Sequence, residues 1–366
     1  CIRRHGVPAA QGPRLGPPCT GRAGRTGCGM ALRRSIVFAT SLFAPLPGLA
    51  REAEAAGFDR VWTTEFPDRD ALVRATVIGL ATERIGVATG IAYSFTRHPL
   101  ALAAAALDVH EAIGGRFTLG LGTATAAMRS RWYGLDEGRA IGRLADAVAL
   151  IRGAWAAEGR FHHDGEFFQG RVEGLNLAGR AAALPALPVY GSGLNAAMLR
   201  GAARCCDGLG LHPLAAAPLY AERTIAPILA ARPKGFPAAM WVITQIDEDG
   251  NAARDRARRA LAFFFSTPGY ETAAEGEPWA DAPERIRRRF AETRADWDAV
   301  GAEVPDGMVD AMTLAGTPDE VRERLPAVEA RLAEVGIDEL VFQTGADLDE
   351  PTFVANCRQI ITCCRP

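Results

Sequence analysis

Short apolar runs alternate along this chain with longer segments whose apolar positions recur at helical spacing. In the clearest unit, residues 85–91 are apolar and β-branched, residues 100–113 are rich in Ala and Leu and end at two glycines, and residues 117–122 form a second apolar run. Strands with almost no polar alternation are typical of parallel sheets that helices cover on both faces. Glycines directly after a helical run mark its end. The pattern therefore predicts a strand–helix–strand unit.

The same alternation continues along the chain, and we count eight strand–helix repeats. Residues 159–174 carry glycine turns between aromatic-rich runs and predict a hairpin inserted after the fourth strand. Eight repeats over this length favour an α/β fold of the closed (β/α)8 type, the TIM barrel, over an open sheet. The predicted strands are residues 36–40, 60–66, 85–91, 117–122, 188–191, 207–212, 240–247 and 339–344, and the predicted helices are 49–56, 72–81, 100–113, 137–156, 195–204, 217–231, 251–266 and 318–335.

Residues 1–33 differ in composition from the rest of the chain. They contain six arginines and no Asp or Glu, and they show no apolar periodicity. Such a segment cannot bury a core, so we expect a disordered basic tail and a barrel domain over residues 34–366. The first methionine is Met30, close to the first predicted strand. Residues 1–29 are thus expected to come from an upstream-extended gene model, with a genuine basic extension as the alternative.

Charge and cysteine spacing exclude several function classes. The formal net charge is −2, and the part after the arginine-rich tail is more acidic, which argues against nucleic acid and anionic membrane partners. No apolar run approaches the length of a membrane span. The eight cysteines include adjacent pairs but no CxxC motif, and the six histidines are scattered. We therefore expect no metal site, and reduced thiols in a cytoplasmic protein.

The predicted strand ends indicate the kind of site. In a (β/α)8 barrel, functional residues lie at the carboxyl ends of the strands. Here those ends carry glycines, hydroxyl groups and few charges, which argues against acyl transfer and metal-dependent hydrolysis and favours a planar cofactor held by backbone and small residues. The residues at these ends are Ala39, Thr40, Glu65, Phe66, Gly90, Ile91, Tyr93, Gly122, Thr123, Gly191, Ser192, Gly193, His212, Pro213, Gln245, Thr344 and Gly345.

Five motifs in order carry a family resemblance over roughly residues 34–345. They read RVWTTEF, ERIGVATGIAYSFTRHPLALAAAALDVHEAIGGRFTLGLGT, LPVYGSGLNAAMLRGAARCCDGLG, IDEDGNAARDRARRALAFF and AGTPDEVRERL. In this order they resemble the luciferase-like flavin and deazaflavin oxidoreductases, and within them the methylene-tetrahydromethanopterin reductase type. The resemblance implies a (β/α)8 barrel that binds coenzyme F420, or FMN in sister branches.

The resemblance also implies cofactor-binding residues. Gly90-Ile91 matches a non-prolyl cis peptide behind the cofactor ring, although Gly90 could be a simple strand-end glycine. The loop formed by Gly191, Ser192, Gly193 and Asn195 matches the one that holds the cofactor phosphate, and its glycines could alternatively serve only a turn. A glycine-rich turn that leads into a helix presents N–H groups and a positive dipole end to an anion. Gly122 and Thr123 match a loop near the cofactor tail, and Thr40 ends the first strand.

Glu65 is the candidate catalytic residue. It matches an acidic position that the family usually follows with His, but Phe66 stands there instead. Glu65 is therefore expected to shuttle a proton or to orient the ring, and the alternative is a structural ion pair with Arg97 or Arg69. His98 is expected to cap a helix. Trp132 and Tyr133 could line a substrate pocket or simply pack as aromatic residues, and the role of His212 is left open.

Three functions follow from the resemblance. The first is F420-dependent hydride transfer to or from a small organic substrate that the sequence does not identify. The second is an FMN-dependent luciferase-like monooxygenase that acts on paired donors with reduction of molecular oxygen. The third is a non-catalytic flavin-binding relative. We expect a homodimer, and a flavin or F420 reductase as a partner.

Overall fold

A computed structural model describes residues 32–366, apart from 136–137, 294–295 and 346–347. The predicted basic tail thus lies outside the described residues, except for its last two positions. The first strand, β1, begins at Arg33, and Leu32 before it is buried in the core. The first residue of the predicted helix 137–156 also falls outside the described part, and the helix itself begins at Ala140.

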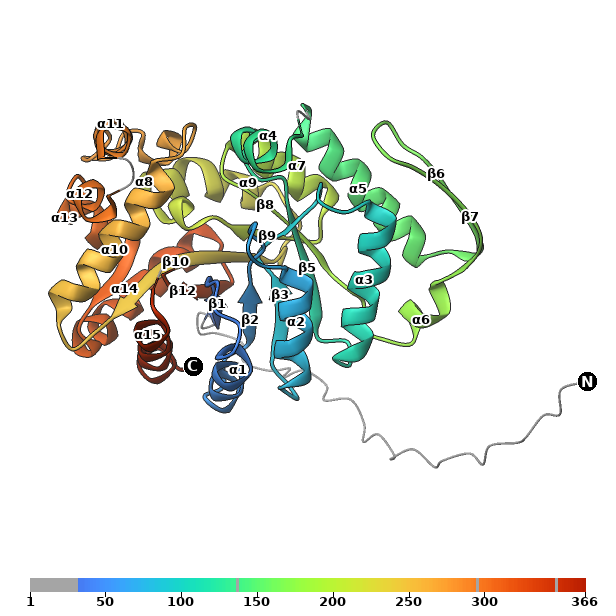
Figure 1. The fold of residues 1–366 in the computed structure, drawn as a ribbon, viewed down its shortest axis with the longest axis horizontal. Helices are drawn as coiled ribbons and strands as arrows, with labels where there is room; N and C mark the ends of the chain where they lie inside the picture. Colours follow the sequence, from blue (N-terminus) through green and yellow to red (C-terminus); the bar gives the residue numbers. More distant parts are fainter. Residues whose placement is uncertain (1–31, 136–137, 294–295, 346–347) are drawn as a thin grey trace, which may run out of the picture. The chain divides into compact units, whose positions relative to one another are not determined.

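Eight parallel strands close into a ring, which confirms the predicted (β/α)8 barrel (Figure 1). Each strand pairs with the next, and the last strand pairs with the first through contacts such as Ser35 with Val341. The ring consists of β1 (Arg33–Phe38), β2 (Arg60–Thr63), β3 (Gly86–Thr89), β5 (Phe117–Gly122), β8 (Val189–Gly193), β9 (Gly208–Leu211), β10 (Ala238–Ile246) and β12 (Glu339–Gln343).

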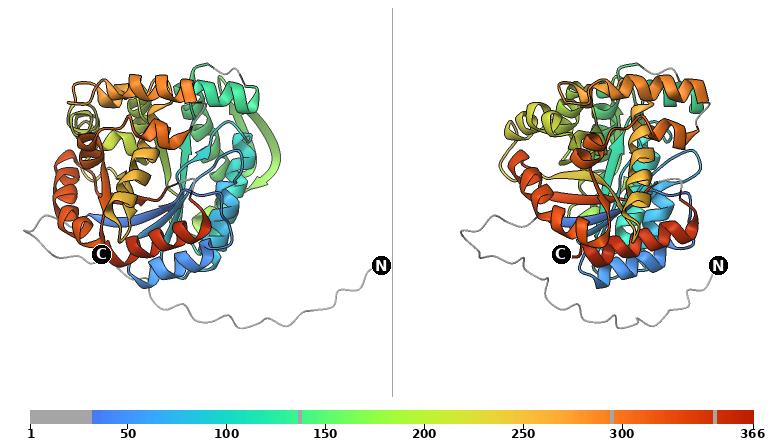
Figure 2. Two further views of the ribbon diagram at one scale, coloured as in Figure 1. Left: turned by 60° about the vertical axis from the view of Figure 1, so that its left-hand side comes forward. Right: turned by 90° about the vertical axis from the view of Figure 1, so that its left-hand side faces the viewer.

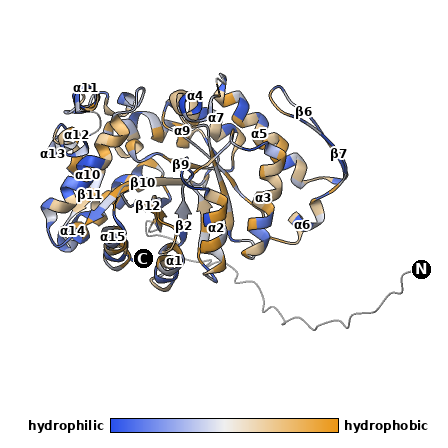
Figure 3. Ribbon diagram, viewed as in Figure 1, coloured by the Kyte–Doolittle hydropathy of each residue, from blue (hydrophilic) through white to orange (hydrophobic). Residues whose placement is uncertain are grey.

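Helices follow the barrel strands along the chain. Their buried faces match the apolar periodicity, whereas hydrophilic residues gather on outer surfaces such as those of α10 and α14 (Figure 3). The last strand is followed by α15, which the sequence analysis did not predict. The helices after the eight strands are α1 (Leu46–Ala55), α2 (Ala71–Leu80), α3 (Pro99–Ala112), α5 (Ala140–Trp155), α7 (Ala196–Cys205), the continuous run α8 (Pro218–Tyr220), η2 (Ala221–Ile225) and α9 (Ala226–Ala230), α10 (Gly250–Phe265) and α15 (Glu350–Cys363).

Several shorter elements interrupt the repeats. The hairpin β6–β7 lies between α5 and β8, as predicted. Between α10 and β12 the chain adds a helical insertion and a further strand, β11, that pairs with β10. Figure 2 shows α11 of this insertion at the end of the barrel opposite α1. The added elements are β4 (Ala92–Tyr93), α4 (Ala126–Tyr133), β6 (Glu158–Asp164), β7 (Gln169–Asn176), α6 (Ala178–Ala182), η1 (Pro213–Ala216), η3 (Glu271–Ala274), α11 (Ala282–Thr293), α12 (Trp297–Gly301), α13 (Asp306–Met312), β11 (Thr313–Gly316) and α14 (Pro318–Val335).

Two apolar clusters reflect the two faces of the barrel strands. In β1, Ile36 and Phe38 belong to the large cluster that the helices cover, whereas Val37 between them belongs to a separate inner cluster. Successive side chains of a strand point to opposite faces, so every second residue faces the barrel interior. The inner cluster consists of Val37, Ala39, Trp62, Ala88, Tyr190, Ala239 and Val341, with Trp241 packed against it.

A charged network lies at the amino end of the ring. Glu339, the first residue of β12, is fully buried and accepts hydrogen bonds from Trp62 Nε1 at 2.9 Å and Arg60 Nη1 at 2.7 Å. A buried carboxylate with two such donors is a structural arrangement, because breaking it would leave a charge uncompensated. A functional cavity is therefore expected at the opposite, carboxyl end.

Candidate active site

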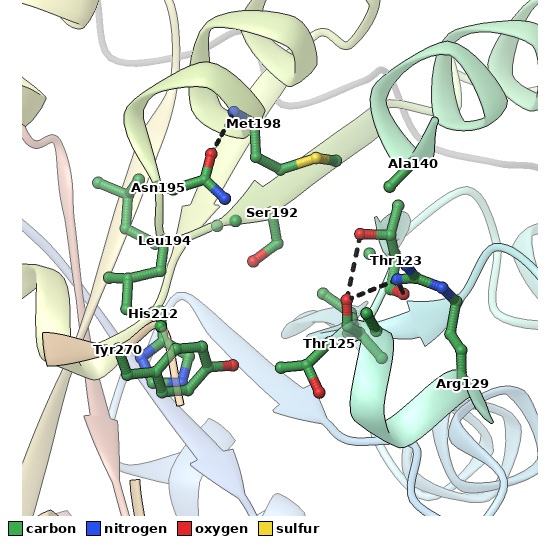
Figure 4. A pocket seen from close by; sticks show the side chains of 18 of the residues that line it. Thr123, Thr125, Arg129, Ala140, Ser192, Leu194, Asn195, Met198, His212 and Tyr270 are labelled. Carbon is green, nitrogen blue, oxygen red and sulfur yellow. Dashed lines mark hydrogen bonds between the residues drawn. The ribbon is translucent and has the colours of Figure 1, made fainter. Parts of the chain in front are cut away.

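A cavity of about 370 Å³ lies at the carboxyl ends of β3, β5, β8 and β9. Its size and its mixture of apolar side chains with a few polar groups are typical of a small-molecule or cofactor site. Figure 4 shows Ser192 and Asn195 on one side, Thr123, Thr125 and Arg129 on the other, and His212 beside Tyr270. The described residues that line it are Gly90, Ile91, Gly122, Thr123, Ala124, Thr125, Ala126, Arg129, Ala140, Ser192, Gly193, Leu194, Asn195, Met198, Gly210, Leu211, His212, Trp241, Pro268, Gly269 and Tyr270.

The peptide bond between Gly90 and Ile91 is cis and lies directly after β3. Its neighbours are close: a Cβ atom on Gly90 would lie 2.2 Å from the Trp241 ring. A Cβ atom on Gly122 would likewise lie 2.0 Å from Ile91 Cδ1. Glycine is needed at both positions because backbone, isoleucine and tryptophan meet here without room for a side chain. Backbone and apolar atoms therefore form this wall of the cavity.

The end of β8 and the start of α7 form a second wall. Asn195 is the N-cap of α7, and its Oδ1 atom accepts a hydrogen bond from the Met198 backbone N–H at 2.8 Å. The helix is ten residues long, so its N-terminus carries a partial positive charge, and Asn195 and Met198 of this end line the cavity. Ser192 and Gly193 precede it and also line the cavity. This wall is suited to an anion.

Arg129 brings a positive charge to the opposite wall. Its side chain belongs to α4, and the residue is only 8% exposed. Its Nη1 atom donates to the carbonyl oxygens of Thr123 at 2.7 Å and Ala124 at 3.1 Å. Arg129 therefore fixes the loop after β5 and also places a guanidinium group at the cavity.

His212 and Tyr270 form an aromatic side of the cavity. Their ring centroids are 4.9 Å apart, and the His212 ring also packs 4.7 Å from Phe264. The Nδ1 atom of His212 accepts a hydrogen bond from the Leu214 backbone N–H at 3.2 Å. Burial lowers the pKa of His212 to about 3 and raises the pKa of Tyr270 to about 12. Both side chains are therefore neutral near pH 7.

Seven of the nine predicted cofactor-binding residues line this cavity, and two do not. Thr40 lies away from it: its hydroxyl accepts a hydrogen bond from the Leu42 N–H, and its carbonyl accepts one from Arg74. Gly191 faces α7, where a Cβ atom would lie 2.7 Å from Ala202. The seven that the structure brings together are Gly90, Ile91, Gly122, Thr123, Ser192, Gly193 and Asn195.

Glu65 is not among the described residues that line the cavity. It is 7% exposed, and its carboxylate accepts hydrogen bonds from the Tyr93 N–H at 3.0 Å, Thr96 Oγ1 at 3.2 Å and Arg97 Nη1 at 2.8 Å. Arg97 also pairs with Asp70. Burial raises the pKa of Glu65, against the lowering effect of Arg97. These contacts correspond to the ion pair that the sequence analysis gave as the alternative.

The other aromatic and histidine predictions can also be placed. Trp132 packs on Phe66 with ring centroids 4.8 Å apart, and Tyr133 packs on Phe95 at 5.3 Å. Neither is among the described cavity-lining residues, and both pack against other aromatic rings. His98 is the N-cap of α3, as predicted, because its Nδ1 atom accepts a hydrogen bond from the Leu100 N–H.

The sequence analysis missed several lining residues. Arg129 lies in an eight-residue helix with no motif, and Tyr270 comes from the loop after α10, far along the chain. Trp241 lies in mid-strand, where it resembles any core aromatic residue. Only the assembled barrel brings these three side chains to one cavity, so no local signal could have identified them.

Metal-ligand clusters and membrane-spanning helices are absent from the described residues. No group of three or more His, Cys, Asp or Glu side chains among them could hold a metal ion. In the same part of the chain, no helix is long and apolar enough to cross a membrane.

Comparison with known proteins identifies related sequences. The chain is 28% identical over 299 residues to the 5,10-methylenetetrahydromethanopterin reductase of Archaeoglobus fulgidus, covering 79% of this chain and 86% of that protein. It is also 28% identical over 301 residues to the enzyme of the same name from Methanolobus tindarius, covering 80% and 87% of the two chains.

Solved structures share the fold. The coenzyme F420-dependent tetrahydromethanopterin reductase from Methanopyrus kandleri matches with a TM-score of 0.72 at 18% identity, over 91% of this chain and 98% of that one. The FMN complex of a type II Baeyer–Villiger monooxygenase component from Pseudomonas putida matches with a TM-score of 0.64 at 16% identity, over 92% and 99%. The sequence profile of the luciferase-like monooxygenase family matches residues 36–335. The chain therefore belongs to the luciferase-like monooxygenase family.

Proposed function

We propose that this chain is an F420-dependent oxidoreductase that transfers a hydride between the deazaflavin and a small organic substrate. The observation that carries the proposal is the cavity itself, with the cis peptide Gly90-Ile91 in one wall and a helix N-terminus in the adjacent wall. Two relatives with 28% identity are named as methylenetetrahydromethanopterin reductases, and a fold neighbour is named as F420-dependent. These names support F420 as the cofactor.

The lining residues fit a planar cofactor with an anionic tail. Ile91, Leu194 and Trp241 offer apolar surface beside the backbone at Gly90, where a side chain would collide with Trp241. Ser192, Gly193 and the first amides of α7 would hold a phosphate. Arg129 would add a positive charge from the opposite wall. When bound, the deazaflavin supplies the carbon atom that gives or accepts the hydride.

Neutral polar groups complete the site. His212 and Tyr270 are uncharged near pH 7, so they can hydrogen-bond to a substrate without stabilising an ion in the cavity. The packing of His212 against Phe264 keeps that side apolar. An apolar wall of this kind excludes water and so protects a hydride from reaction with it. The proton shuttle predicted for Glu65 stays a prediction, and its contacts favour a role in holding the strand end at Tyr93.

Equilibrium titration of the purified protein with F420 and with FMN tests the proposal. We expect saturable F420 binding, followed by fluorescence, with a Kd at least tenfold below that for FMN, a difference of about 1.4 kcal/mol. Tighter FMN binding would contradict the proposal and favour the monooxygenase. Binding of neither cofactor would also contradict it.

The oligomeric state, the reductase partner and the cellular location are further proposals. We expect a homodimer, which light scattering would show as twice the chain mass. A flavin or F420 reductase is expected to supply reduced cofactor, and its addition should sustain turnover. A cytoplasmic location is the third proposal, and it rests on the charge and the cysteine usage of the sequence.

A further inference from the structure

The chain contains two pairs of adjacent cysteines, and the proposed function uses neither. Cys205 and Cys206 lie where α7 ends, and Cys363 and Cys364 lie where α15 ends. The two pairs share the same covalent spacing and the same position at a helix C-terminus. They differ in how the surrounding fold directs their side chains, and this difference makes one pair a control for the other.

The thiols of Cys205 and Cys206 face each other. Their Sγ atoms are 3.7 Å apart, within hydrogen-bonding distance for sulfur. Cys205 is half-buried, whereas Cys206 is only 6% exposed. The backbone leaves the helix at Cys206, which has extended dihedral angles (φ −107°, ψ 165°). The pair therefore combines one thiol with access to solvent and one sheltered thiol.

The second pair is arranged differently. Cys363 Sγ lies 3.5 Å from Arg322 Nη2 and 3.9 Å from Gln359 Oε1. Cys364 is fully buried, and burial raises its pKa. Burial also raises the pKa of Cys363. Both thiols of this pair are thus sheltered from a soluble oxidant and biased towards the unreactive protonated form.

Electrostatics give the two facing thiols different roles. The hydrogen bond from Cys206 lowers the pKa of Cys205, and the positive charge of Arg152 acts in the same direction. The same contact, together with burial, raises the pKa of Cys206. The thiolate is the nucleophilic form of cysteine, so Cys205 is the side chain that a peroxide would meet first.

We propose that Cys205 and Cys206 form a thiol redox site, in which hydrogen peroxide converts the pair into a reversible vicinal disulfide. The Cys205 thiolate attacks one peroxide oxygen, so an S–O bond forms, the O–O bond breaks and hydroxide leaves. Cys206 then attacks the Cys205 sulfur, so the S–S bond forms and the oxygen leaves as water. Overall, two thiols and one hydrogen peroxide give one disulfide and two waters, with sulfur oxidised and oxygen reduced.

The geometry of adjacent residues makes this bond easy to reduce. Neighbouring Cα atoms across a trans peptide are ~3.8 Å apart. Unstrained disulfides join Cα atoms roughly 4.4–6.8 Å apart, and strained ones have more oxidising potentials. A disulfide between Cys205 and Cys206 is therefore expected to be opened by ordinary dithiols.

The pair also lies directly behind the proposed cofactor loop. A Cβ atom placed on Gly191 would lie 2.9 Å from Cys206 Sγ, and the next two residues, Ser192 and Gly193, line the cavity. Asp207 then binds the start of β8, because its Oδ2 atom accepts a hydrogen bond from the Val189 N–H at 2.9 Å. The redox site thus adjoins the strand that carries this wall of the cavity.

Peptide mass spectrometry tests the proposal without knowledge of cofactor or substrate. Trypsin places the two pairs in separate peptides, residues 205–223 and 359–366. The folded full-length protein is exposed to hydrogen peroxide, quenched, denatured and alkylated. We expect peptide 205–223 to lose two hydrogens and to resist alkylation, and both properties to reverse with dithiothreitol. Peptide 359–366 should keep two alkylatable thiols.

A variant identifies the order of the two steps. In Cys206→Ala the sulfenic acid on Cys205 has no partner, so we expect a dimedone adduct on Cys205 that the wild type does not accumulate. Cys363→Ala serves as the matched control and should leave the oxidation of peptide 205–223 unchanged. Two alkylatable thiols in the peroxide-treated wild-type peptide 205–223, or equal oxidation of both pairs, would overturn the proposal. Equal dimedone labelling of wild type and Cys206→Ala would do the same.

Discussion

The contacts of the Glu65 side chain favour one of the two roles considered for it, and a variant tests both. Its carboxylate holds the Tyr93 N–H and Arg97 and lies outside the set of described cavity-lining residues. Glu65→Gln keeps the size of the side chain but removes its charge. We expect a loss of about 1–3 kcal/mol in the free energy of unfolding, because a buried hydrogen-bonded carboxylate is replaced, and a nearly unchanged rate of hydride transfer per folded molecule.

Denaturant unfolding and single-turnover kinetics on the same variant measure both quantities, with a substrate that the wild type turns over. Glu222→Gln, at an exposed helical position, is the control for loss of a carboxylate. A rate that drops roughly 10²–10⁴-fold at unchanged stability would instead support a proton shuttle, since this is the usual contribution of a positioned acid or base.

Residue by residue, the site was predictable where a motif fixed the backbone. Gly90, Gly122 and Gly193 were predicted from the motifs that carry the family resemblance, and in the structure their contacts leave no room for a side chain. Arg129 and Tyr270 were not found, because a long side chain can reach a cavity from many places in a sequence. Thr40 was expected to end the first strand, but β1 ends at Phe38, and Thr40 lies in the following loop, where its hydroxyl accepts a hydrogen bond from the Leu42 N–H.

At the scale of elements, one carboxylate anchors the β6–β7 hairpin. Asp146 in α5 accepts hydrogen bonds from the Phe167 N–H at 2.6 Å and the Phe168 N–H at 2.9 Å, and its Oδ1 atom lies 2.7 Å from His163 Nε2. Asp146→Asn should cost about 1–3 kcal/mol locally, because the amide cannot accept all of these bonds. We expect faster amide exchange across the hairpin and little change in the barrel strands.

Hydrogen exchange followed by mass spectrometry measures this effect, and Asp164→Asn, at an exposed position within the hairpin, is the matched control. Burial raises the pKa of Asp146, but the hydrogen bonds from Phe167, His163 and Phe168 outweigh it, so the pKa is lowered. A lowered pKa stabilises the folded state above the ordinary pKa of Asp, and this stability is lost as the pH falls through the folded value. Equal amide exchange across the hairpin in Asp146→Asn and Asp164→Asn would show that Asp146 does not anchor the β6–β7 hairpin.

Most elements followed from their periodicity, and the exceptions have physical reasons. The strand β11 was not predicted because it begins at Thr313, directly after α13 ends at Met312, so no turn separates the two elements, and it extends the pairing of β10 beyond the barrel. For α15 a signal was present: Asp349 caps the helix by accepting from the Thr352 N–H, and a proline occupies its first turn. The predicted second strand was too long, because β2 ends at Thr63 rather than at Phe66.

The described barrel as a whole separates stability from function. The amino end of the ring holds the buried Glu339 network, and the carboxyl end holds the cavity. The sequence was sufficient to predict that the carboxyl ends of the strands gather at one end of the barrel, because eight repeats of one unit determine where strand ends gather. It could not identify the substrate, because the remaining walls come from loops and helices without a recurring pattern.

The central claim is that the anionic part of F420 binds at the wall formed by β8 and α7. Gly193→Asp places a negative charge there, whereas Gly179→Asp adds the same charge in α6, where a side chain meets open space. Ser192→Asp adds a second, independent charge at the same wall. The melting temperatures of all three variants and of the wild type should be measured first, so that only variants as stable as the wild type are compared.

The deciding measurement is the Kd for F420 of these variants. We expect Gly193→Asp and Ser192→Asp to weaken F420 binding by at least about tenfold, because like charges repel at the helix N-terminus, and Gly179→Asp to leave it unchanged. A side chain on Gly193 would also meet Met198, so Ser192→Asp is the variant that isolates the effect of charge. Wild-type affinity in folded Gly193→Asp and Ser192→Asp would contradict the account.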